Sequence, residues 1–156
     1  MRVLFMCTAN SCRSILSEGM FNHLAPPGFE AVSAGSFPKG QVLPRSLTTL
    51  QQAGISIDGL HCKGNDAFEG NPPDIVITVC DKAAGETCPV YFGPALKSHW
   101  GFEDPSEVTA DEAAIDAAFR ATLAHIERRC RAFLDLPFTR LSRDELKTEL
   151  DRIGVL

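Results

Sequence analysis

Apolar residues along the chain fall into short continuous runs that alternate with stretches of helical spacing. Four of these runs, at residues 2–6, 29–33, 74–79 and 97–102, are bounded by turn-forming or charged residues and predict buried strands. The pattern over residues 55–74 is less clear. There we expect a short strand at 55–57 and a helical turn at 66–68.

The first two helices are predicted between these runs. One begins at Ser14 and ends before the Pro-Pro-Gly of residues 26–28. A second begins at Pro44, which suits the first turn of a helix, and Gly54 fits its C-terminal cap. The apolar face of the first helix is formed by Leu16, Met20 and Leu24. Each of these helices can therefore bury one side against the sheet.

A long helix and a short one are predicted in the last third of the chain. Thr109 and Glu112 have the spacing of a capping box before the long helix, and Pro137 lies beyond its end. Ser142 and Glu145 repeat the capping pattern before the last helix. The apolar stripe of the long helix is Ile115, Phe119, Thr122, Ile126, Cys130 and Phe133. Strands that alternate with helices favour an α/β fold with a parallel sheet, which binds ligands at the carboxyl ends of its strands.

Length and charge limit the classes of function. A chain of 156 residues suits one domain that buries about 68–70% of its unfolded surface. Its net charge of −5 argues against nucleic acid and anionic membranes as partners. No apolar run is long enough to span a membrane or to serve as a signal-peptide core, so we expect a cytoplasmic protein. In that compartment the six cysteines are expected to be catalytic, redox-active or buried.

The first chemical motif is Cys7 at the end of the first strand, followed by Arg13 and then a helix. A cysteine that faces a helix N-terminus lies near N–H groups and positive charge, which favour the reactive thiolate. Arg13 adds a fork of donors suited to oxyanions. The loop can thus bind a tetrahedral oxyanion and attack its central atom. The spacing alone also occurs by chance, so a buried structural cysteine is the alternative.

The second motif is the pair Cys80 and Cys88, which follows the strand at 74–79. Their separation is too long for a CxxC redox or zinc pair, but it suits a loop that brings two thiols together or apart. Two unrelated cysteines remain one alternative. A zinc site completed by a histidine is another, although no ligand spacing supports it.

Residues 7–14, Cys-Thr-Ala-Asn-Ser-Cys-Arg-Ser, resemble the phosphate-binding loop of low-molecular-weight protein tyrosine phosphatases. They resemble more closely the loop of the arsenate reductases that share this fold. Thioredoxin-type members of that group carry a redox pair after the strand that corresponds to 74–79, and residues 99–105 resemble their acid loop. The resemblance implies a three-layer sandwich with a central four-stranded parallel sheet flanked by helices. It covers residues 1–136, and 137–156 form a helical extension of the same domain.

The resemblance also implies roles for individual residues. The oxyanion site is formed by Thr8, Ala9, Asn10, Ser11, Cys12, Arg13 and Ser14. In this scheme Cys7 attacks arsenate, Asp104 acts as general acid, and Cys80 attacks Cys7 to release arsenite. Cys88 then attacks Cys80, and thioredoxin, or glutathione with glutaredoxin, reduces the resulting Cys80–Cys88 disulfide. No cofactor is required.

A structural potassium ion is a further implication of the resemblance. Asn10, Glu18, Ser33 and Asp66 match positions that bind this ion in some of the reductases. The match at Asp66 is the loosest of the four. Ser14, which follows the loop arginine, is expected to hydrogen-bond the Cys7 thiolate, to cap the first helix, or to do both.

Two other functions remain open on the sequence. A phosphatase acting on phosphotyrosine or small phosphoesters uses Cys7, Arg13 and Asp104 but leaves the second cysteine pair idle. Phosphotyrosine sites of this family are rimmed by tyrosines near the acid loop, whereas the only tyrosine here is Tyr91. A non-enzymatic thiol sensor or arsenite-binding protein is the third possibility, and it leaves Arg13 and Asp104 unexplained.

Overall fold

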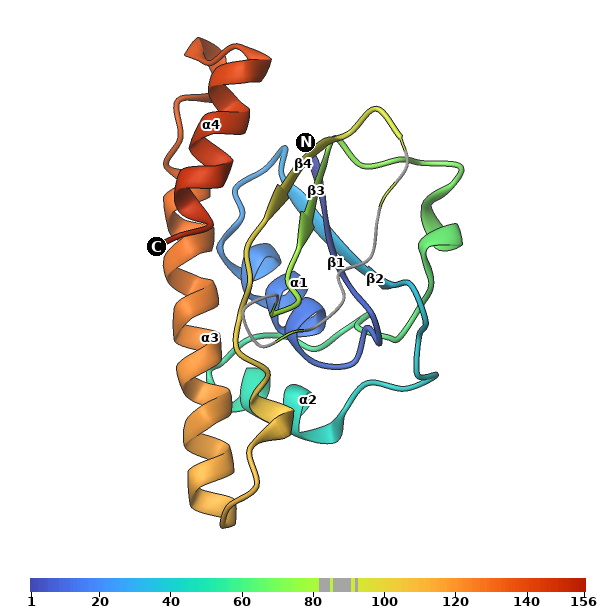
Figure 1. The fold of residues 1–156 in the computed structure, drawn as a ribbon, viewed down its shortest axis with the longest axis vertical. Coiled ribbons are helices and arrows are strands. Elements are labelled where there is room, and N and C mark those ends of the chain that lie inside the picture. The colour runs from blue at the N-terminus through green and yellow to red at the C-terminus, as the bar shows by residue number, and fades with distance from the viewer. Residues whose placement is uncertain (82–84, 86–90, 92) are drawn as a thin grey trace.

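The centre of the computed structural model, which describes residues 1–81, 85, 91 and 93–156, is a sheet of four parallel strands. Their order in the sheet is β2-β1-β3-β4 (Figure 1). The strands are β1 (Arg2–Cys7), β2 (Glu30–Gly35), β3 (Ile75–Thr78) and β4 (Leu96–His99). The predicted parallel sheet of four strands is therefore confirmed. The fourth strand ends at His99, before the predicted residue 102.

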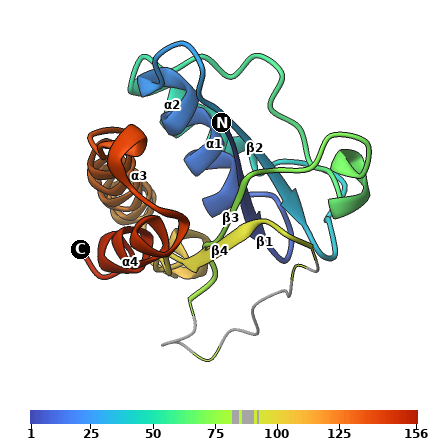
Figure 2. The same ribbon diagram turned by 90° about the horizontal axis from the view of Figure 1, so that it is seen from above.

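Four α-helices lie on the same side of this sheet (Figure 2). They are α1 (Arg13–Leu24), α2 (Pro44–Gln52), α3 (Glu112–Leu134) and α4 (Arg143–Ile153). Short 3₁₀ helices are formed by η1 (Asn65–Phe68), η3 (Pro105–Glu107) and η4 (Phe138–Arg140). The first of these confirms the helical turn predicted at 66–68. Within the described part of the chain, no helix is long and apolar enough to cross a membrane.

Successive side chains of β1 and β3 point to opposite faces of the sheet, as the pleat of a strand requires. Val3 and Phe5, with Ile77 beside them, face the four α-helices and belong to the main core. Leu4 and Met6 face the other way, where Phe68 of η1 packs against them. The layers are thus α-helices, sheet, and the connection that carries η1. This arrangement agrees with the predicted sheet flanked by helices.

The strand expected at residues 55–57 is not formed, so this prediction is wrong. Ile55 is buried in the main core, and its N–H donates to Leu50 O at 2.9 Å as the chain leaves α2. Residues 55–57 belong to none of the four strands of the sheet. The apolar pattern here marks burial of Ile55 against the helices, which a short run of apolar residues does not distinguish from strand pairing.

The N-terminal cap of α3 also differs from the prediction of a Thr109 capping box. The helix begins at Glu112, and its N-cap is Asp111, whose side chain accepts a hydrogen bond from Ala114 N at 2.8 Å. Aspartate is as good an N-cap as serine and better than threonine, and here it lies closer to the apolar stripe. The capping box of α4 is present as predicted, with Ser142 and Glu145 bonded reciprocally.

The last helix closes the main core over β4. Trp100 Nε1 donates to Leu150 O at 3.0 Å, and Ser98 Oγ donates to Asp151 Oδ1 at 2.7 Å. Leu150 and Ile153 of α4 are fully buried. Because the acid-loop residue Trp100 is anchored to α4, the C-terminal segment supports the region that carries the candidate general acid.

We predict that Leu150→Ala lowers the free energy of unfolding by about 2–5 kcal/mol, the usual cost of removing a buried leucine side chain. Val155→Ala is the matched control, since Val155 is 83% exposed, and its effect should stay within about 0.5 kcal/mol. Urea denaturation followed by tryptophan fluorescence measures both variants. Equal effects would show that α4 does not belong to the cooperative core.

Candidate active site

The loop between β1 and α1 is held open by hydrogen bonds to its carbonyl groups. These groups accept from the N–H groups of the segment that follows β2. The pairs are Cys7 with Ser36 at 3.0 Å, Thr8 with Phe37 at 2.9 Å, and Ala9 with Lys39 at 3.1 Å. A trans peptide holds its C=O and N–H on opposite sides, so the N–H groups of residues 8–10 point away from the segment that follows β2, and that of Asn10 donates to Cys7 Sγ. The loop thus forms a cradle of N–H groups beside the N-terminus of a helix, which suits an anion.

Asn10 determines the shape of this loop. Its backbone has φ +51°, a left-handed conformation that asparagine adopts more readily than most residues. Its side-chain Nδ2 donates to Ser14 Oγ at 2.9 Å and to Ser33 Oγ at 3.0 Å, and its Oδ1 accepts from Lys63 N at 2.9 Å. Asn10 therefore connects the loop to α1, to β2 and to the segment before η1.

Cys7 is a free thiol, only 5% exposed, whose sulfur lies between two polar groups. The N–H of Asn10 donates to Cys7 Sγ at 3.1 Å, and Ser14 Oγ lies 2.9 Å from the same sulfur. Because Ser14 Oγ already accepts from Asn10 Nδ2, it can direct its own hydrogen at the sulfur. Two donors at one sulfur are the surroundings that a thiolate requires.

Cys12 lies in the same loop, but its surroundings favour the neutral thiol. Burial raises the pKa of its thiol to about 12, so it stays protonated near neutral pH. Burial also raises the pKa of Cys130, on the inner face of α3. All three thiols are buried, and Cys7 differs in having both the Asn10 N–H and Ser14 Oγ at its sulfur.

Arg13, the first residue of α1, reaches from the loop to the acid loop. Its Nη1 donates to Phe102 O at 3.1 Å, and its Nη2 donates to Asp104 Oδ2 at 3.3 Å. The other oxygen of Asp104 accepts from Ser106 N at 3.0 Å and caps η3. Arg13 and Asp104 are 91 residues apart in sequence, and this ion pair joins them at one site.

Arg129 of α3, which the sequence analysis did not single out, supports the acid loop from behind. It is 4% exposed, donates to Gly101 O at 3.0 Å and lies 4.6 Å from the centre of the Phe102 ring. Burial lowers its pKa to about 10, so it remains charged near neutral pH. A sequence signal for it exists, since Arg129 interrupts the apolar stripe of α3 between Ile126 and Phe133.

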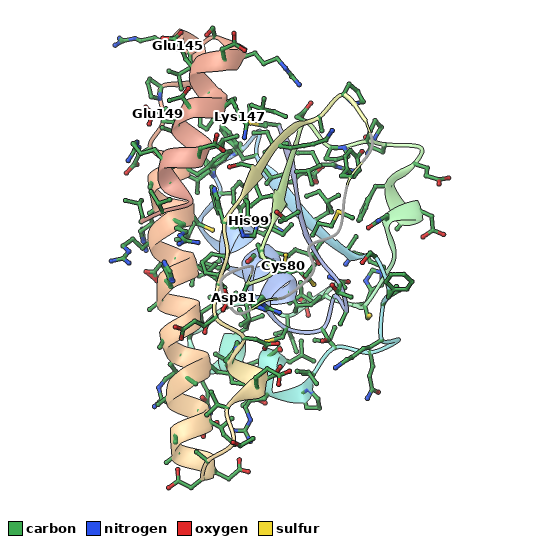
Figure 3. The ribbon with its side chains drawn as sticks, viewed as in Figure 1. Cys80, Asp81, His99, Glu145, Lys147 and Glu149 are labelled. Carbon is green, nitrogen blue, oxygen red and sulfur yellow. The ribbon has the colours of Figure 1, made fainter. Side chains whose placement is uncertain are left out.

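Cys80 and Asp81 follow β3 (Figure 3), and they lie at the same edge of the sheet as Cys7, the last residue of β1. Thr78 pairs with Met6 across β3 and β1, so the chain positions beyond them leave the sheet side by side. Cys80 is 1% exposed and disulfide-bonded. The predicted partner thiol, Cys88, lies outside the described residues. A cavity of about 480 Å³ opens at this edge, and Asp81, Asp104 and His125 are among its lining residues.

Three of the four residues expected to bind potassium lie together. Ser33 Oγ donates to Glu18 Oε1 at 2.7 Å, and Asn10 Nδ2 donates to Ser33 Oγ. Asp66 is exposed on η1, and no hydrogen bond among the described residues joins its side chain to the other three. The Lys63 ammonium contacts both Glu18 and Ser33. Within the described ranges, no group of three or more His, Cys, Asp or Glu residues is arranged to hold a metal.

An exposed aromatic residue, Phe37, is bonded to the loop through its backbone. Phe37 is 78% exposed, and its N–H donates to Thr8 O. The family resemblance predicts an aromatic rim only beside the acid loop, and the sequence gives no signal for this segment. Only the hydrogen bonds from residues 36–39 to the loop place Phe37 beside the site.

Comparison with known proteins agrees with this geometry. The model of the low molecular weight phosphotyrosine protein phosphatase family matches residues 2–149. The chain belongs to this family. Within the family it is similar to an arsenate reductase of Bacillus subtilis, 30% identical over 133 residues, which are 85% of this chain and 94% of the relative.

Solved structures of the family point the same way. An arsenate reductase from Archaeoglobus fulgidus has a TM-score of 0.72 at 25% identity and covers 86% of this chain and 99% of its own. A thioredoxin-dependent arsenate reductase from Corynebacterium glutamicum has a TM-score of 0.53 at 26% identity, covering 83% of this chain and 61% of its own. The expected family and its fold are therefore confirmed.

Gly35, at the end of β2, lies against the active-site loop, and only the structure reveals this contact. A Cβ atom there would lie 2.5 Å from Thr8 O and 2.9 Å from Asn10 N, both of them backbone atoms of the loop. We predict that Gly35→Ala displaces the loop and lowers the free energy of unfolding by about 1–3 kcal/mol. Gly70→Ala is the control, because nothing lies within 4 Å of its Cβ position. Equal urea midpoints for the two variants would contradict the close approach.

Ser14 provides a second prediction at this site. Removing a donor from the thiolate makes the charged form less stable, so Ser14→Ala should move the pH profile of Cys7 alkylation by iodoacetamide upward, by about one unit. Ser17→Ala is the matched control, because Ser17 Oγ is buried on the same helix and donates to Arg13 O instead. Mass spectrometry of the Cys7 peptide gives the profile, and an unshifted Ser14→Ala profile would exclude a bond to the thiolate.

Proposed function

We propose that this protein is an arsenate reductase with Cys7 as its nucleophile. The observation that carries the proposal is the pairing of a Cys7 sulfur that faces two donors with an Arg13–Asp104 ion pair at the mouth of the same loop. The chain covers nearly the whole length of relatives that share this fold and are named arsenate reductases. Arsenate is a tetrahedral oxyanion of the size and charge that such a loop accommodates.

The first step joins arsenate to the protein. The oxyanion lies on the N–H groups of the loop and on Arg13, which exchanges part of its contact with Asp104 for the ligand. The Cys7 thiolate attacks arsenic, and a sulfur–arsenic bond replaces one arsenic–oxygen bond. Asp104 donates a proton to the departing oxygen, which leaves as water. Arg129 keeps the acid loop in place through Gly101 and Phe102 while this happens.

The second step transfers electrons to arsenic. The Cys80 thiolate attacks Cys7 Sγ, a sulfur–sulfur bond forms, and the electron pair of the sulfur–arsenic bond stays on arsenic, which leaves as arsenite. Cys88 then attacks Cys80, which frees the Cys7 thiolate and leaves a Cys80–Cys88 disulfide. The burial of Cys80 at the end of β3, its disulfide state and the free thiol of Cys7 support this order of events.

A dithiol reductant must open the disulfide before the next turnover. We infer that thioredoxin supplies these electrons, because the structural relative from Corynebacterium glutamicum is named as thioredoxin-dependent. Glutathione with glutaredoxin is the other source that the chemistry allows. Either donor acts in a reducing compartment, so the proposal includes a cytoplasmic location.

One observation favours a second, weaker activity on aryl phosphates. Phosphate has the shape of arsenate, the family model is that of a phosphotyrosine phosphatase, and the exposed ring of Phe37 stands beside the loop. A planar leaving group can stack on such a ring. Cys80 and Cys88 have no part in this hydrolysis. A non-enzymatic thiol sensor or arsenite-binding protein has no comparable support, because such a role does not explain the contact of Arg13 with Asp104.

The experiment that tests the proposal is arsenate-dependent oxidation of NADPH with two purified reducing systems. One contains thioredoxin and thioredoxin reductase, and the other contains glutathione, glutaredoxin and glutathione reductase. We expect turnover with thioredoxin and little with the second system. Turnover only with glutathione would replace the donor but keep the reaction. Silence in both, with para-nitrophenyl phosphate still hydrolysed, would overturn the reductase in favour of the phosphatase.

The relay predicts a distinct behaviour for Cys88→Ser. The variant should release about one arsenite per protein in a burst and then stop. Without the Cys88 thiol, the Cys7–Cys80 disulfide cannot be exchanged for a Cys80–Cys88 disulfide. Its steady-state rate with thioredoxin should fall at least about 100-fold, a loss of nearly 3 kcal/mol in transition-state terms. Cys130→Ala, in α3 and outside the loop, is the control that should keep cycling. Sustained turnover of Cys88→Ser at the wild-type rate would exclude the relay.

A further inference from the structure

Lys63 places a positive charge among the oxygen atoms that are expected to hold a potassium ion. Its Nζ lies 3.4 Å from Glu18 Oε1 and 3.4 Å from Ser33 Oγ, and it donates to His61 O at 2.9 Å. The side chains of Lys63 and Glu18 are only 11% and 10% exposed. The Lys63 ammonium therefore lies among three oxygen atoms in a mostly buried position, beside groups that are expected to bind a monovalent cation.

The hydrogen bonds of Ser33 leave no lone pair for a free cation at the same place. A hydroxyl has one hydrogen and two lone pairs. Ser33 Oγ gives its hydrogen to Glu18 Oε1 and accepts from Asn10 Nδ2 and from the Lys63 ammonium. An ion bound to Ser33 would have to displace the ammonium. With Asp66 exposed on η1, the residues as they stand do not fit a free potassium ion.

Hydrogen bonds through Asn10 connect Lys63 to the nucleophile Cys7. Its backbone N–H donates to Asn10 Oδ1 at 2.9 Å, and its ammonium contacts Ser33, to which Asn10 Nδ2 also donates. Asn10 in turn donates to Ser14 Oγ and, through its N–H, to Cys7 Sγ. The position of the charge thus influences the two donors at the sulfur.

We propose that the Lys63 ammonium replaces the structural potassium ion in this protein, so that the active-site loop is held in shape without a free cation. Lys63 is a positioning residue, since it acts on Cys7 through Asn10 and Ser33. Removing its charge leaves Glu18 as a nearly buried carboxylate without a counter-charge, which is strongly unfavourable. The proposal concerns the loop itself and does not depend on arsenate being the substrate.

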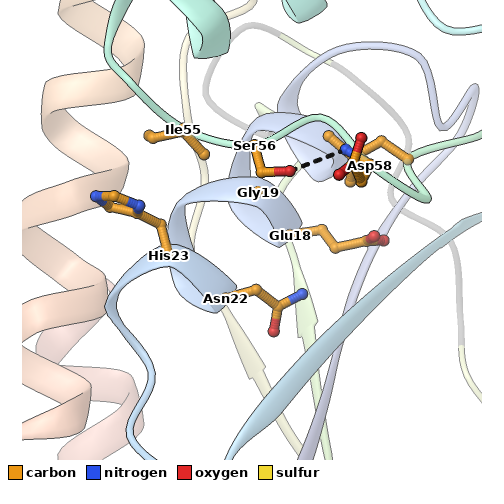
Figure 4. A pocket seen from close by; sticks show the side chains of 8 residues that line it. Glu18, Gly19, Asn22, His23, Ile55, Ser56 and Asp58 are labelled. Carbon is orange, nitrogen blue, oxygen red and sulfur yellow. Dashed lines mark hydrogen bonds between the residues drawn. The ribbon is translucent and has the colours of Figure 1, made fainter.

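The surroundings of Glu18 provide a way for an ion to enter once the ammonium is gone. Glu18 and Asn22 of α1 line a cavity of about 230 Å³ together with Ser56 and Asp58 (Figure 4). Figure 4 shows Glu18 extending from α1 on the same side as Asn22, with Asp58 across the cavity. Two carboxylates that line one cavity attract a cation. A variant without the lysine charge should therefore bind a monovalent ion that the natural chain does not need.

The test compares Lys63→Met with Lys147→Met in potassium, sodium and tetramethylammonium chloride at equal ionic strength. Lys147 is an exposed lysine whose ion pair with Asp151 makes it a matched control (Figure 3). The readouts are the melting temperature and the pH profile of Cys7 alkylation. For Lys63→Met in tetramethylammonium we expect a loss of at least about 4 °C and a profile moved to higher pH. Potassium should restore at least half of both changes, and it should leave the natural chain and Lys147→Met unaffected.

The double variant Lys63→Met with Glu18→Gln separates charge compensation from packing. With Glu18 neutral, the missing ammonium leaves no buried charge, so the double variant should melt above Lys63→Met and lose its response to potassium. It also serves as the test if Lys63→Met alone does not fold. Two results would overturn the proposal: potassium that specifically stabilises the natural chain, or variants at position 63 that respond equally to all three cations. Neither readout uses arsenate, so both stand apart from the proposed reaction.

Discussion

The active site depends on one side chain, Asn10, whose amide holds together three segments that are distant in sequence. It accepts from Lys63, donates to Ser14 and Ser33, and its own N–H faces Cys7 Sγ. The left-handed backbone of Asn10 turns that N–H to the sulfur. A buried amide that satisfies its donors and its acceptor at once has one favourable orientation, so the loop has one shape. The donors at Cys7 follow from that shape rather than from the cysteine itself.

The sheet and the helices place the remaining parts around this loop. Parallel strands bring Cys7 and Cys80 to one edge, and the glycine at the end of β2 lets its chain approach the loop closely. The acid loop reaches the same edge because Trp100 is anchored to α4 and Gly101 to Arg129 of α3. The large buried aromatic residues therefore do more than fill the core. Trp100, for example, anchors the acid loop that carries Asp104 to α4.

Charge is used locally in this protein. The chain carries a net charge of −5, yet the loop gathers Arg13, the amide groups and the N-terminus of α1 at one point, and Lys63 lies just behind it. An anion is thus attracted by short-range hydrogen bonds rather than by the field of the whole molecule. The thiols are also controlled by their immediate surroundings, because burial keeps Cys12 protonated in the same loop as the nucleophile Cys7.

The sequence by itself determined the order of strands and helices, the Cys7 loop and the acid loop, because each is encoded locally. Apolar periodicity marks burial, and the loop motif places thiol, amides and arginine within eight residues. Local patterns misplaced the strand at 55–57 and the cap of α3, where burial of Ile55 and a nearer aspartate decide the structure. Only the tertiary structure brought Asp104 to Arg13, Arg129 to the acid loop, and Lys63 to Glu18 and Ser33. These contacts join segments far apart in the chain, and nothing in the neighbouring sequence of any one of them specifies its partner.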